Sequence, residues 1–295
     1  MDEHVIEYLV PESIEEAVSL RRRHGATARF IAGGTEVVPM MTQGRMKERQ
    51  LIELSRLPGL NGIEEEPDGL LLGAAVSLAR LAAAPSVLRR WQALAEAAGS
   101  IREPQVRNRG TIGGNVSHGV PSADLVPALL VLGAGIGLAG PNGRRWLPLA
   151  QFLVGPYRTA LGPEELVVQI RLPAPAPHEG SAFQKLTKFG GSGLSVATAA
   201  AALVMEGGRI SAARLAIGSA GPVPVRVAEA EAFLTGKAPT DDVLARAGGM
   251  ASAAADPREG SIRASPAHRH RVLKTLAARA IALAAERSSS TGRAG

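Results

Sequence analysis

The first part of the chain alternates short apolar runs with one amphipathic stripe. The apolar runs predict buried strands over residues 5–9, 28–32 and 51–54. Ser13 and Glu16 form a capping-box pattern ahead of the stripe, so we expect a helix there that Gly25 ends. A further helix or turn is expected from Val37. Together these elements predict a small α+β unit over roughly residues 1–56.

Turn residues and short helical stripes mark the second part of the chain, about residues 57–175. The run from Glu66 to Gly69 has the composition of a tight turn, which predicts a hairpin over residues 60–72. The expected helices, with Ser77 and Ser86 capping the first two, cover residues 78–83, 87–98 and 125–132, and a strand covers residues 166–172. The Pro-rich run at residues 173–177 then predicts a stiff linker and a domain boundary.

Longer apolar segments and amphipathic helices follow the linker. An antiparallel meander is expected over residues 182–189, 196–205 and 210–219, followed by helices over residues 229–234, 241–253 and 267–285. The sequence therefore predicts a smaller α+β domain at residues 178–287, with an antiparallel sheet and helices. The Ser-rich end, residues 288–295, is predicted to be a disordered tail.

A G-x-G-x-x-G pattern at Gly135–Gly140 resembles the dinucleotide fingerprint, but its surroundings do not fit. A Rossmann loop opens a helix and has an acidic residue about 20 positions later. Here Pro141 and Gly143 follow directly, and the next acids are Glu164 and Glu165. We therefore expect a strand–turn–strand at this point.

Composition narrows the classes of function. The chain has 295 residues, 45% of them hydrophobic and 20% charged, which indicates a globular protein with more than one packed unit. It has no cysteine, so it can form no disulfide and hold no cysteine-bound iron–sulfur cluster. The start lacks the pattern of a signal peptide, and no apolar run is long enough to span a membrane, so we expect a cytoplasmic protein without membrane insertion.

The net charge of +6 raises the question of nucleic-acid binding. From residue 256 onward there are eight Lys/Arg and three Asp/Glu, so most of the excess lies near the C-terminus. Tyr8 and Tyr157 are isolated, and no basic segment carries interleaved aromatic residues for stacking bases. We expect no nucleic-acid partner. A solvated basic tail or a face for an acidic partner explains the charge better.

The most informative segment surrounds the adjacent glycines Gly113 and Gly114. Adjacent glycines permit unusual backbone conformations and the close approach of a ligand, and successive N–H groups in such a turn can form an anion-binding nest. Thr111 and Asn115 add side-chain donors on either side. Asp124 can only accept hydrogen bonds, which suits ligand hydroxyls. The segment is compatible with a ligand that carries both phosphate and polyol, and equally with an ordinary Gly-rich turn.

A second paired-glycine loop favours the ligand interpretation. Phe30 and Ile31 belong to an apolar run that leads into Gly33, Gly34 and Thr35. One such loop after a strand is weak support. Two such loops, each with hydroxyl or amide side chains beside it, suggest that both bind one extended ligand.

The two loops together carry a resemblance to a known family. Ala32-Gly33-Gly34-Thr35 and Thr111-Ile112-Gly113-Gly114-Asn115, with Pro121 and Asp124, resemble the FAD-binding medium subunit of molybdenum hydroxylases such as carbon monoxide and xanthine dehydrogenases. The resemblance covers nearly the whole chain. It implies a two-subdomain FAD-binding domain of the vanillyl-alcohol-oxidase (PCMH) type over residues 1–175, ahead of the C-terminal domain.

The resemblance also implies a set of residues that bind FAD non-covalently. The first loop would bind the pyrophosphate, and the second loop would supply further contacts to the cofactor. Asp124 would accept hydrogen bonds from ribityl or ribose hydroxyls. Ile101 takes the place of an apolar contact, Leu166 or Val167 would pack on the isoalloxazine ring, and Lys185 would lie near the flavin, unless it is a surface lysine. The implied residues are Ala32, Gly33, Gly34, Thr35, Glu36, Val37, Ile101, Thr111, Gly113, Gly114, Asn115, Asp124, Leu166, Val167 and Lys185.

The sequence departs from the family pattern beside the flavin. Glu36 is longer than the usual residue after the first loop, and Gly193 stands where an Asp is common. No nucleophile–base pair is visible, and the histidines have no metal-ligand spacing, so we expect neither a catalytic side chain nor a metal site. His118 lies in the flavin loop, where a covalent link is conceivable, but we expect non-covalent FAD.

Three functions remain compatible with the sequence. The resemblance implies an electron-transfer flavoprotein subunit that works with a small subunit holding [2Fe–2S] clusters and a large subunit holding the molybdenum cofactor, as a dimer of heterotrimers. A stand-alone FAD-dependent oxidase or reductase is the alternative, but no base or oxyanion constellation is visible for it. The third is a non-redox module that binds another phosphorylated ligand. Flavin content and co-purifying subunits separate the three.

Overall fold

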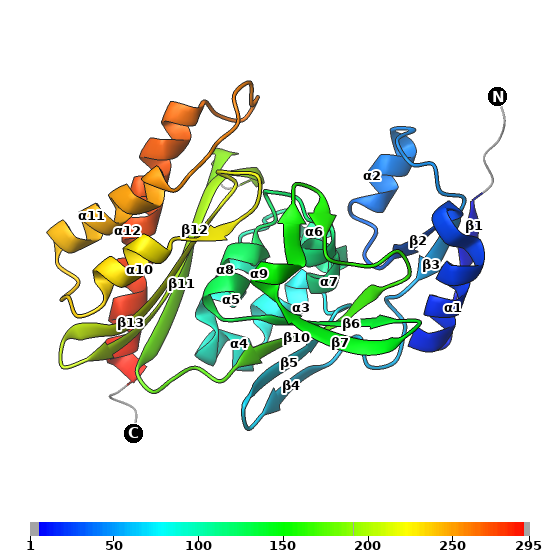
Figure 1. The fold of residues 1–295 in the computed structure, drawn as a ribbon, viewed down its shortest axis with the longest axis horizontal. Coiled ribbons are helices and arrows are strands. Elements are labelled where there is room, and N and C mark those ends of the chain that lie inside the picture. The colour runs from blue at the N-terminus through cyan, green and yellow to red at the C-terminus, as the bar shows by residue number, and fades with distance from the viewer. Residues whose placement is uncertain (1–5, 191, 292–295) are drawn as a thin grey trace.

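The computed structural model describes residues 6–190 and 192–291. The chain forms an N-terminal lobe, a middle region and a C-terminal domain, arranged in a row with the middle region between the other two (Figure 1). Within the described residues, no helix combines the length and the apolar character needed to cross a bilayer.

The N-terminal lobe is a parallel sheet with helices. Its elements are β1 (Glu7–Leu9), α1 (Ile14–His24), the 3₁₀ turn Gly25–Thr27, β2 (Ala28–Ile31), α2 (Val37–Thr42) and β3 (Gln50–Glu53). The strand order is β1-β3-β2. The predicted cap is confirmed, because the Ser13 hydroxyl accepts from the Glu16 amide at 3.0 Å. Gly25 ends α1 at φ 55°, where glycine is favoured.

The middle region combines an antiparallel sheet with a cluster of short helices. Its strands are β4 (Ile63–Glu66), β5 (Gly69–Gly73), β6 (Gly135–Gly140), β7 (Gly143–Pro148), β8 (Leu153–Gly155), β9 (Arg158–Thr159) and β10 (Leu166–Pro173). Its helices are α3 (Leu78–Ala83), α4 (Pro85–Arg90), α5 (Gln92–Gly99), α6 (Pro104–Arg109), α7 (Ile112–Ser117), α8 (Leu125–Val131) and α9 (Leu149–Phe152). The main sheet has the order β4-β5-β10-β6-β7. The hairpin predicted over residues 60–72 and the one replacing the Rossmann interpretation are both confirmed.

One predicted helix is wrong. The sequence predicted a continuous helix over residues 87–98 capped by Ser86, but the structure has two helices that meet at Trp91. Pro85 occupies the first turn of α4, where a missing N–H costs nothing, so Ser86 lies inside the helix. Trp91 leaves the helical conformation at φ −128° and is 1% exposed, so burial of the indole accompanies the break.

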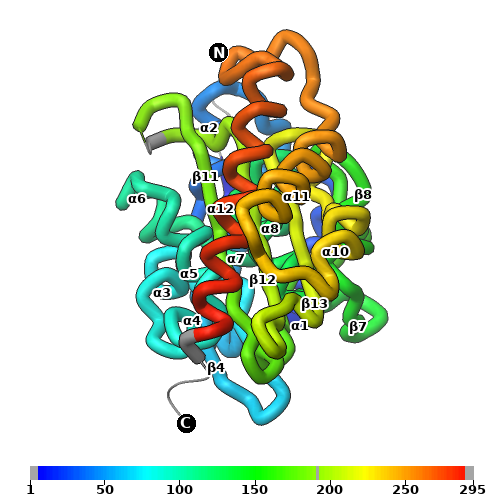
Figure 2. Tube along the Cα trace, turned by 90° about the vertical axis from the view of Figure 1, so that its left-hand side faces the viewer, coloured from blue at the N-terminus to red at the C-terminus, as the bar shows by residue number. Residues whose placement is uncertain are grey.

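The C-terminal domain is an antiparallel sheet covered on one face by helices, as expected. It comprises β11 (Glu179–Phe189), β12 (Ser192–Glu206), β13 (Arg209–Gly218), β14 (Val225–Arg226), α10 (Ala228–Leu234), α11 (Asp241–Ala253) and α12 (Pro266–Thr291). Figure 2 shows α12 running along the sheet, with α10 and α11 beside it. The apolar side chains of α12 and of β12 share a buried core. The mixed α+β fold is therefore confirmed.

The C-terminal end corrects another expectation. Residues 288–291 were predicted to be disordered, but α12 continues through Thr291 and Ser288 is buried. The Ser288 hydroxyl donates to the His178 carbonyl and accepts from the Met205 amide at 3.2 Å. These tertiary contacts stabilise a Ser-rich stretch that has low helix propensity by itself. The remainder of the predicted tail, residues 292–295, lies outside the described residues.

Candidate functional site

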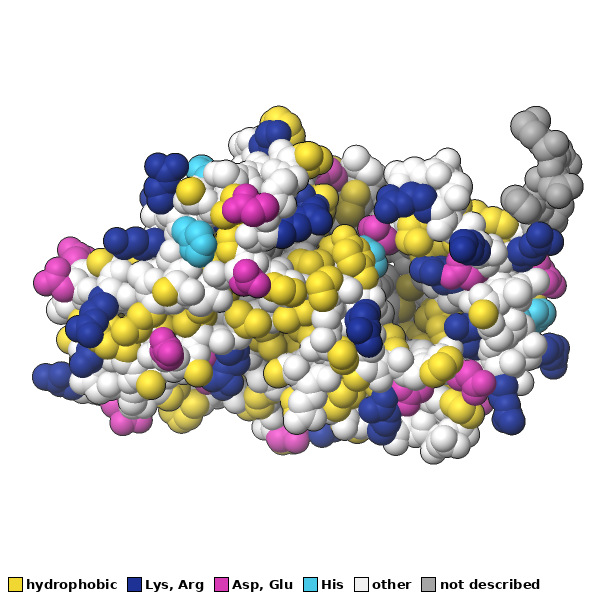
Figure 3. All heavy atoms as spheres, turned by 45° about the horizontal axis from the view of Figure 1, so that its top comes forward, with side chains coloured by type: hydrophobic (Ala, Val, Ile, Leu, Met, Phe, Trp, Pro, Cys, Tyr) yellow, Lys and Arg dark blue, Asp and Glu magenta, His cyan; other side chains and the backbone are white. Residues whose placement is uncertain are grey.

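A cleft of about 580 Å³ lies between the N-terminal lobe, the middle region and the start of the C-terminal domain. In Figure 3 the surface is hollowed between the N-terminal lobe and the rest of the molecule. The predicted residues that line this cleft are Ala32, Gly33, Gly34, Thr35, Glu36, Val37, Ile101, Thr111, Gly114, Asn115, Asp124 and Lys185. The two paired-glycine segments, nearly 80 positions apart in the sequence, therefore face one common space.

The first glycine pair forms an open loop directly after β2. A Cβ on Gly33 would lie 1.8 Å from the Arg109 carbonyl oxygen, so only glycine allows this close approach to α6. Gly34 has φ 72°, in the left-handed region. Among the described residues, no protein group accepts a hydrogen bond from the backbone amides of residues 33–36. Four successive donors thus line the cleft without partners, which is the arrangement of an anion-binding nest.

The second glycine pair is built differently from our expectation. Gly113 and Gly114 have negative φ and lie in the first turn of α7, which Thr111 caps by accepting from the Gly114 amide at 3.0 Å. The Gly113 amide donates to the Ala74 carbonyl at 2.8 Å, and the Ile112 amide is also paired. The prediction that this segment forms an N–H nest is therefore wrong, because its amides are already used within the protein.

The second pair serves close packing and an open surface instead. A Cβ on Gly113 would lie 2.6 Å from the Ala74 Cβ, so this glycine lets α7 contact the end of β5. A Cβ on Gly114 would meet only the Thr111 hydroxyl, at 3.0 Å, and would otherwise point into free space. Next to it the Asn115 side-chain oxygen is buried and has no hydrogen-bond partner within the described part of the chain. Gly114 and Asn115 thus present an accessible surface and an unused acceptor to the cleft.

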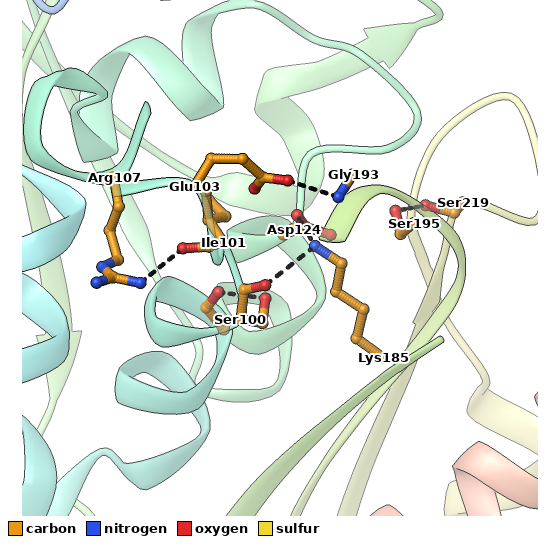
Figure 4. Close-up of polar contacts among 10 residues, drawn as sticks. Ser100, Ile101, Glu103, Arg107, Asp124, Lys185, Gly193, Ser195 and Ser219 are labelled. Carbon is orange, nitrogen blue, oxygen red and sulfur yellow. Dashed lines mark hydrogen bonds and ion pairs between the residues drawn. The ribbon is translucent and has the colours of Figure 1, made fainter. Parts of the chain in front are cut away.

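Asp124 and Lys185 form a buried ion pair at the wall of the cleft (Figure 4). The Lys185 ammonium lies 2.6 Å from Asp124 Oδ2, and the two side chains are 7% and 8% exposed, respectively. Lys185 is therefore not a surface lysine. Burial raises the pKa of Asp124, and the charge of Lys185 opposes that rise. The other carboxylate oxygen, Oδ1, is buried and unpaired among the described residues, so it remains able to accept from a ligand hydroxyl.

A contact that the sequence did not predict connects the middle region to the C-terminal domain. Glu103 Oε1 accepts from the Gly193 amide at 2.7 Å, across 90 positions of sequence (Figure 4). Nearby, the Arg107 guanidinium donates to the Ile101 carbonyl at 2.9 Å and holds that segment against the cleft. No local pattern at Glu103 points to this pairing, since it depends on where the start of β12 lies in space.

The Glu36 side chain contacts His118, and both residues line the cleft. Glu36 is 57% exposed on its side chain, and its Oε1 lies 3.5 Å from His118 Nε2. Burial lowers the pKa of His118, and the Glu36 carboxylate opposes this shift. The His118 ring also contacts Tyr157 edge-on, with ring centroids 5.6 Å apart. His118 and Tyr157 line the cleft, although the sequence pattern did not assign Tyr157 to it.

A second compartment of about 330 Å³ adjoins the cleft and shares Ala32, Thr111 and Gly114 with it. Gly113, Leu166 and Val167 line this compartment and not the part that contains Lys185. Consecutive residues of β10 pack into different cores, Leu166 into that of the N-terminal lobe and Val167 into that of the middle region. Leu166 and Val167 therefore line the adjoining compartment, whereas Lys185 lines the cleft itself; the family resemblance assigned all three to the flavin ring.

The site has no metal-binding character in the described residues, where no group of three or more His, Cys, Asp and Glu side chains is placed to hold a metal ion. Its chemistry is that of binding. A row of free amides suits a diphosphate, and unpaired oxygens at Asn115 and Asp124 suit hydroxyls or ring N–H groups. The donor and acceptor set thus fits FAD, which carries all of these groups.

Comparison with known families agrees with this geometry. Residues 4–175 match the FAD binding domain in molybdopterin dehydrogenase, and residues 181–284 match the CO dehydrogenase flavoprotein C-terminal domain. These matches define a flavoprotein class. The chain belongs to the family of FAD-binding medium subunits of molybdenum hydroxylases, which are oxidoreductases.

Individual relatives support the assignment. The carbon monoxide dehydrogenase medium chain of Hydrogenophaga pseudoflava is 39% identical over 86% of this chain and 88% of its own length. Subunit alpha of the 6-hydroxypseudooxynicotine dehydrogenase complex of Paenarthrobacter nicotinovorans is 30% identical over 97% of this chain and 96% of its own length.

Solved structures of the family superpose closely. In the carbon monoxide dehydrogenase of Hydrogenophaga pseudoflava, the matching chain has a TM-score of 0.92 at 37% identity, covering 96% of this chain and 98% of the other. For quinoline 2-oxidoreductase of Pseudomonas putida the TM-score is 0.90 at 29% identity, with the same coverage.

Proposed function

We propose that this chain is the electron-transfer subunit of a molybdenum hydroxylase, and that it works in the cytoplasm. It receives electrons from [2Fe–2S] clusters in a small partner subunit and passes them through FAD to an external acceptor. A large partner subunit holds the molybdenum cofactor, and the assembly is a dimer of heterotrimers. Support comes from relatives that are themselves named as medium chains or as subunits of dehydrogenase complexes.

One observation carries the flavin part of this proposal. Within the described residues, the amides of residues 33–36, Asn115 Oδ1 and Asp124 Oδ1 have no hydrogen-bond partner, and all of these residues line one cleft. Buried polar atoms normally have partners, so a row of donors opposite two orphaned acceptors indicates a polar ligand. FAD supplies redox chemistry when it is bound.

The bound cofactor would extend through both compartments. The first loop holds the diphosphate, and Asn115 and Asp124 bind polar groups of the cofactor. Ile101 and Lys185 line the cleft that we assign to the isoalloxazine ring, and Leu166 and Val167 line the compartment that adjoins it. Asp124 neutralises Lys185, so the pair stabilises negative charge at the ring less than a free lysine would.

The test is the substitution Gly114→Val. Because a side chain at Gly114 projects into the cleft, we expect a folded protein that no longer retains FAD, measured by the flavin absorbance of the purified chain. Gly249→Val is the matched control, since Gly249 also lies in a helix and a Cβ there would have no atom within 4 Å, but it lies in α11, away from the cleft. Equal flavin content in both folded variants would contradict the assignment.

The partner part of the proposal needs a separate measurement. Native mass measurement of the chain purified from its own cell should find two further subunits, one with iron and one with molybdenum. A chain that carries FAD and turns over an acceptor and a substrate without other subunits would instead be the stand-alone oxidase or reductase.

A further inference from the structure

A third cavity, of about 470 Å³, lies where the segment before α12 meets the middle region. Its wall is shared with the cleft through Val120, Ser122, Tyr157 and Arg263, which line both spaces. Its volume lies in the range of about 300–1,000 Å³ that small-molecule sites occupy. None of the FAD-binding residues predicted from the sequence lines this cavity.

The cavity carries an excess of positive charge. Arg258, Arg263 and Arg269 line it, and Asp256 is the acid on its wall. Within the described part of the chain, none of these arginines forms an ion pair with a carboxylate. Three guanidinium groups therefore line one concave space, with Asp256 as the single acid among its lining residues.

Arg269 is the deepest of the three. It is 6% exposed, and its guanidinium donates to the carbonyls of Val196 and Ser219 and to the Ser261 hydroxyl. Its Nε atom is buried and has no partner among the described residues. Burial lowers the pKa of Arg269, and the charges of Arg263 and Arg258 add to this effect. An anion in the cavity would relieve both the missing hydrogen bond and the repulsion.

Tyr157 supplies an aromatic surface on the shared wall. Tyr157 is 66% exposed, and its backbone has φ 58°, an uncommon conformation for a non-glycine residue that costs free energy. The Tyr157 amide donates to the Gly119 carbonyl at 2.8 Å, which helps to hold the turn in place. An exposed aromatic residue on the wall that Arg263 also lines offers a stacking surface for a base.

We propose that this cavity binds a phosphate-bearing nucleotide, with the phosphates on Arg258, Arg263 and Arg269 and the base against Tyr157. Arginine is suited to phosphate because its planar N–H groups bind two oxygens at once.

The experiment is calorimetric titration of the full chain, saturated with FAD, first with inorganic pyrophosphate and then with ADP. The double variant Arg258→Gln/Arg263→Gln should bind pyrophosphate about 100-fold more weakly, because each charge-assisted contact contributes about tenfold. Arg271→Gln/Arg279→Gln is the matched control, since it removes two exposed arginines from α12 outside the cavity. It should bind like the unchanged chain.

ADP tests the nucleotide part. It should bind more tightly than pyrophosphate, and Tyr157→Ala should remove about tenfold of that gain, as loss of one stacked base does. Equal pyrophosphate binding by the two double variants would overturn the anion site, and ADP binding no tighter than pyrophosphate would overturn the nucleotide.

A titration without FAD separates this proposal from the flavin assignment. The difference in pyrophosphate affinity between the two double variants measures binding in the cavity, whether or not FAD binds. Failure of the flavin assignment would appear only as absent flavin absorbance.

Discussion

The two paired-glycine segments share a sequence pattern but are used in opposite ways. In the part of the chain that the structure describes, the pair Gly33-Gly34 forms a loop whose amides have no protein partner, whereas Gly113-Gly114 begins a helix whose amides are hydrogen-bonded within the protein. In the first pair glycine permits unusual geometry that exposes donors. In the second pair Gly113 permits close packing on Ala74 and Gly114 leaves the surface open. Two similar motifs can therefore contribute to one site in different ways. The first pair supplies hydrogen-bond donors, and the second pair leaves room for the ligand.

Gly33→Ala should have the largest effect. The added Cβ would lie 1.8 Å from the Arg109 carbonyl, so the loop must move away and its amides lose their alignment. We expect FAD affinity to fall at least about 100-fold, as loss of two or more charge-assisted hydrogen bonds implies. Flavin titration measures this. An alanine variant that binds FAD normally would show that the geometry of the first loop does not matter.

Gly113→Ala should act mainly on stability. Its Cβ would contact Ala74 at 2.6 Å, and overpacking of this kind costs about 1–3 kcal/mol. Chemical denaturation of the FAD-free chain measures the loss, and Gly114→Ala is the matched control, because its Cβ meets only a hydroxyl. Equal stability of the two variants would contradict the idea that Gly113 is needed for packing on Ala74 whereas Gly114 only keeps the cleft open.

Thr111→Val should have a smaller effect, because it removes only the cap of α7. Loss of such a cap costs about 1 kcal/mol, and the Gly114 amide would then lack its partner. Thermal unfolding without FAD should show the loss. Ser13→Ala, which removes the similar cap of α1 and does not line the cleft, is the control for stability, and it should leave FAD affinity unchanged.

The smallest effect concerns pH and the first loop. Burial depresses the pKa of His118 in the folded state, so the unfolded chain binds the proton more readily. The contribution of His118 to the free energy of unfolding is therefore fully present above the ordinary histidine pKa of about 6.5. It is lost as the pH falls below that value toward the folded-state pKa. His118→Gln should flatten this part of the stability curve, whereas His268→Gln, on an exposed residue, should not. A curve unchanged by His118→Gln would show that the histidine near Glu36 is not coupled to folding.

Much of the fold followed from local patterns. The caps at Ser13 and Ser77, the turn at Glu66–Gly69 and the hairpin that replaced the Rossmann interpretation depend on neighbouring residues, so sequence periodicity and turn chemistry predicted them. The two glycine segments also identified the cleft, because a glycine pair beside hydroxyl and amide residues is a pattern of neighbouring residues that the sequence shows directly.

What only the tertiary structure decided concerns partners distant in sequence. The Asp124–Lys185 pair, the Glu103–Gly193 contact and the placement of Leu166 and Lys185 in adjoining compartments depend on how three units pack. No local pattern encodes that packing. The same holds for the amides of the two loops. Whether an N–H group is free or paired depends on which carbonyl lies opposite it, and for Gly113 that carbonyl belongs to Ala74, 39 positions earlier in the chain.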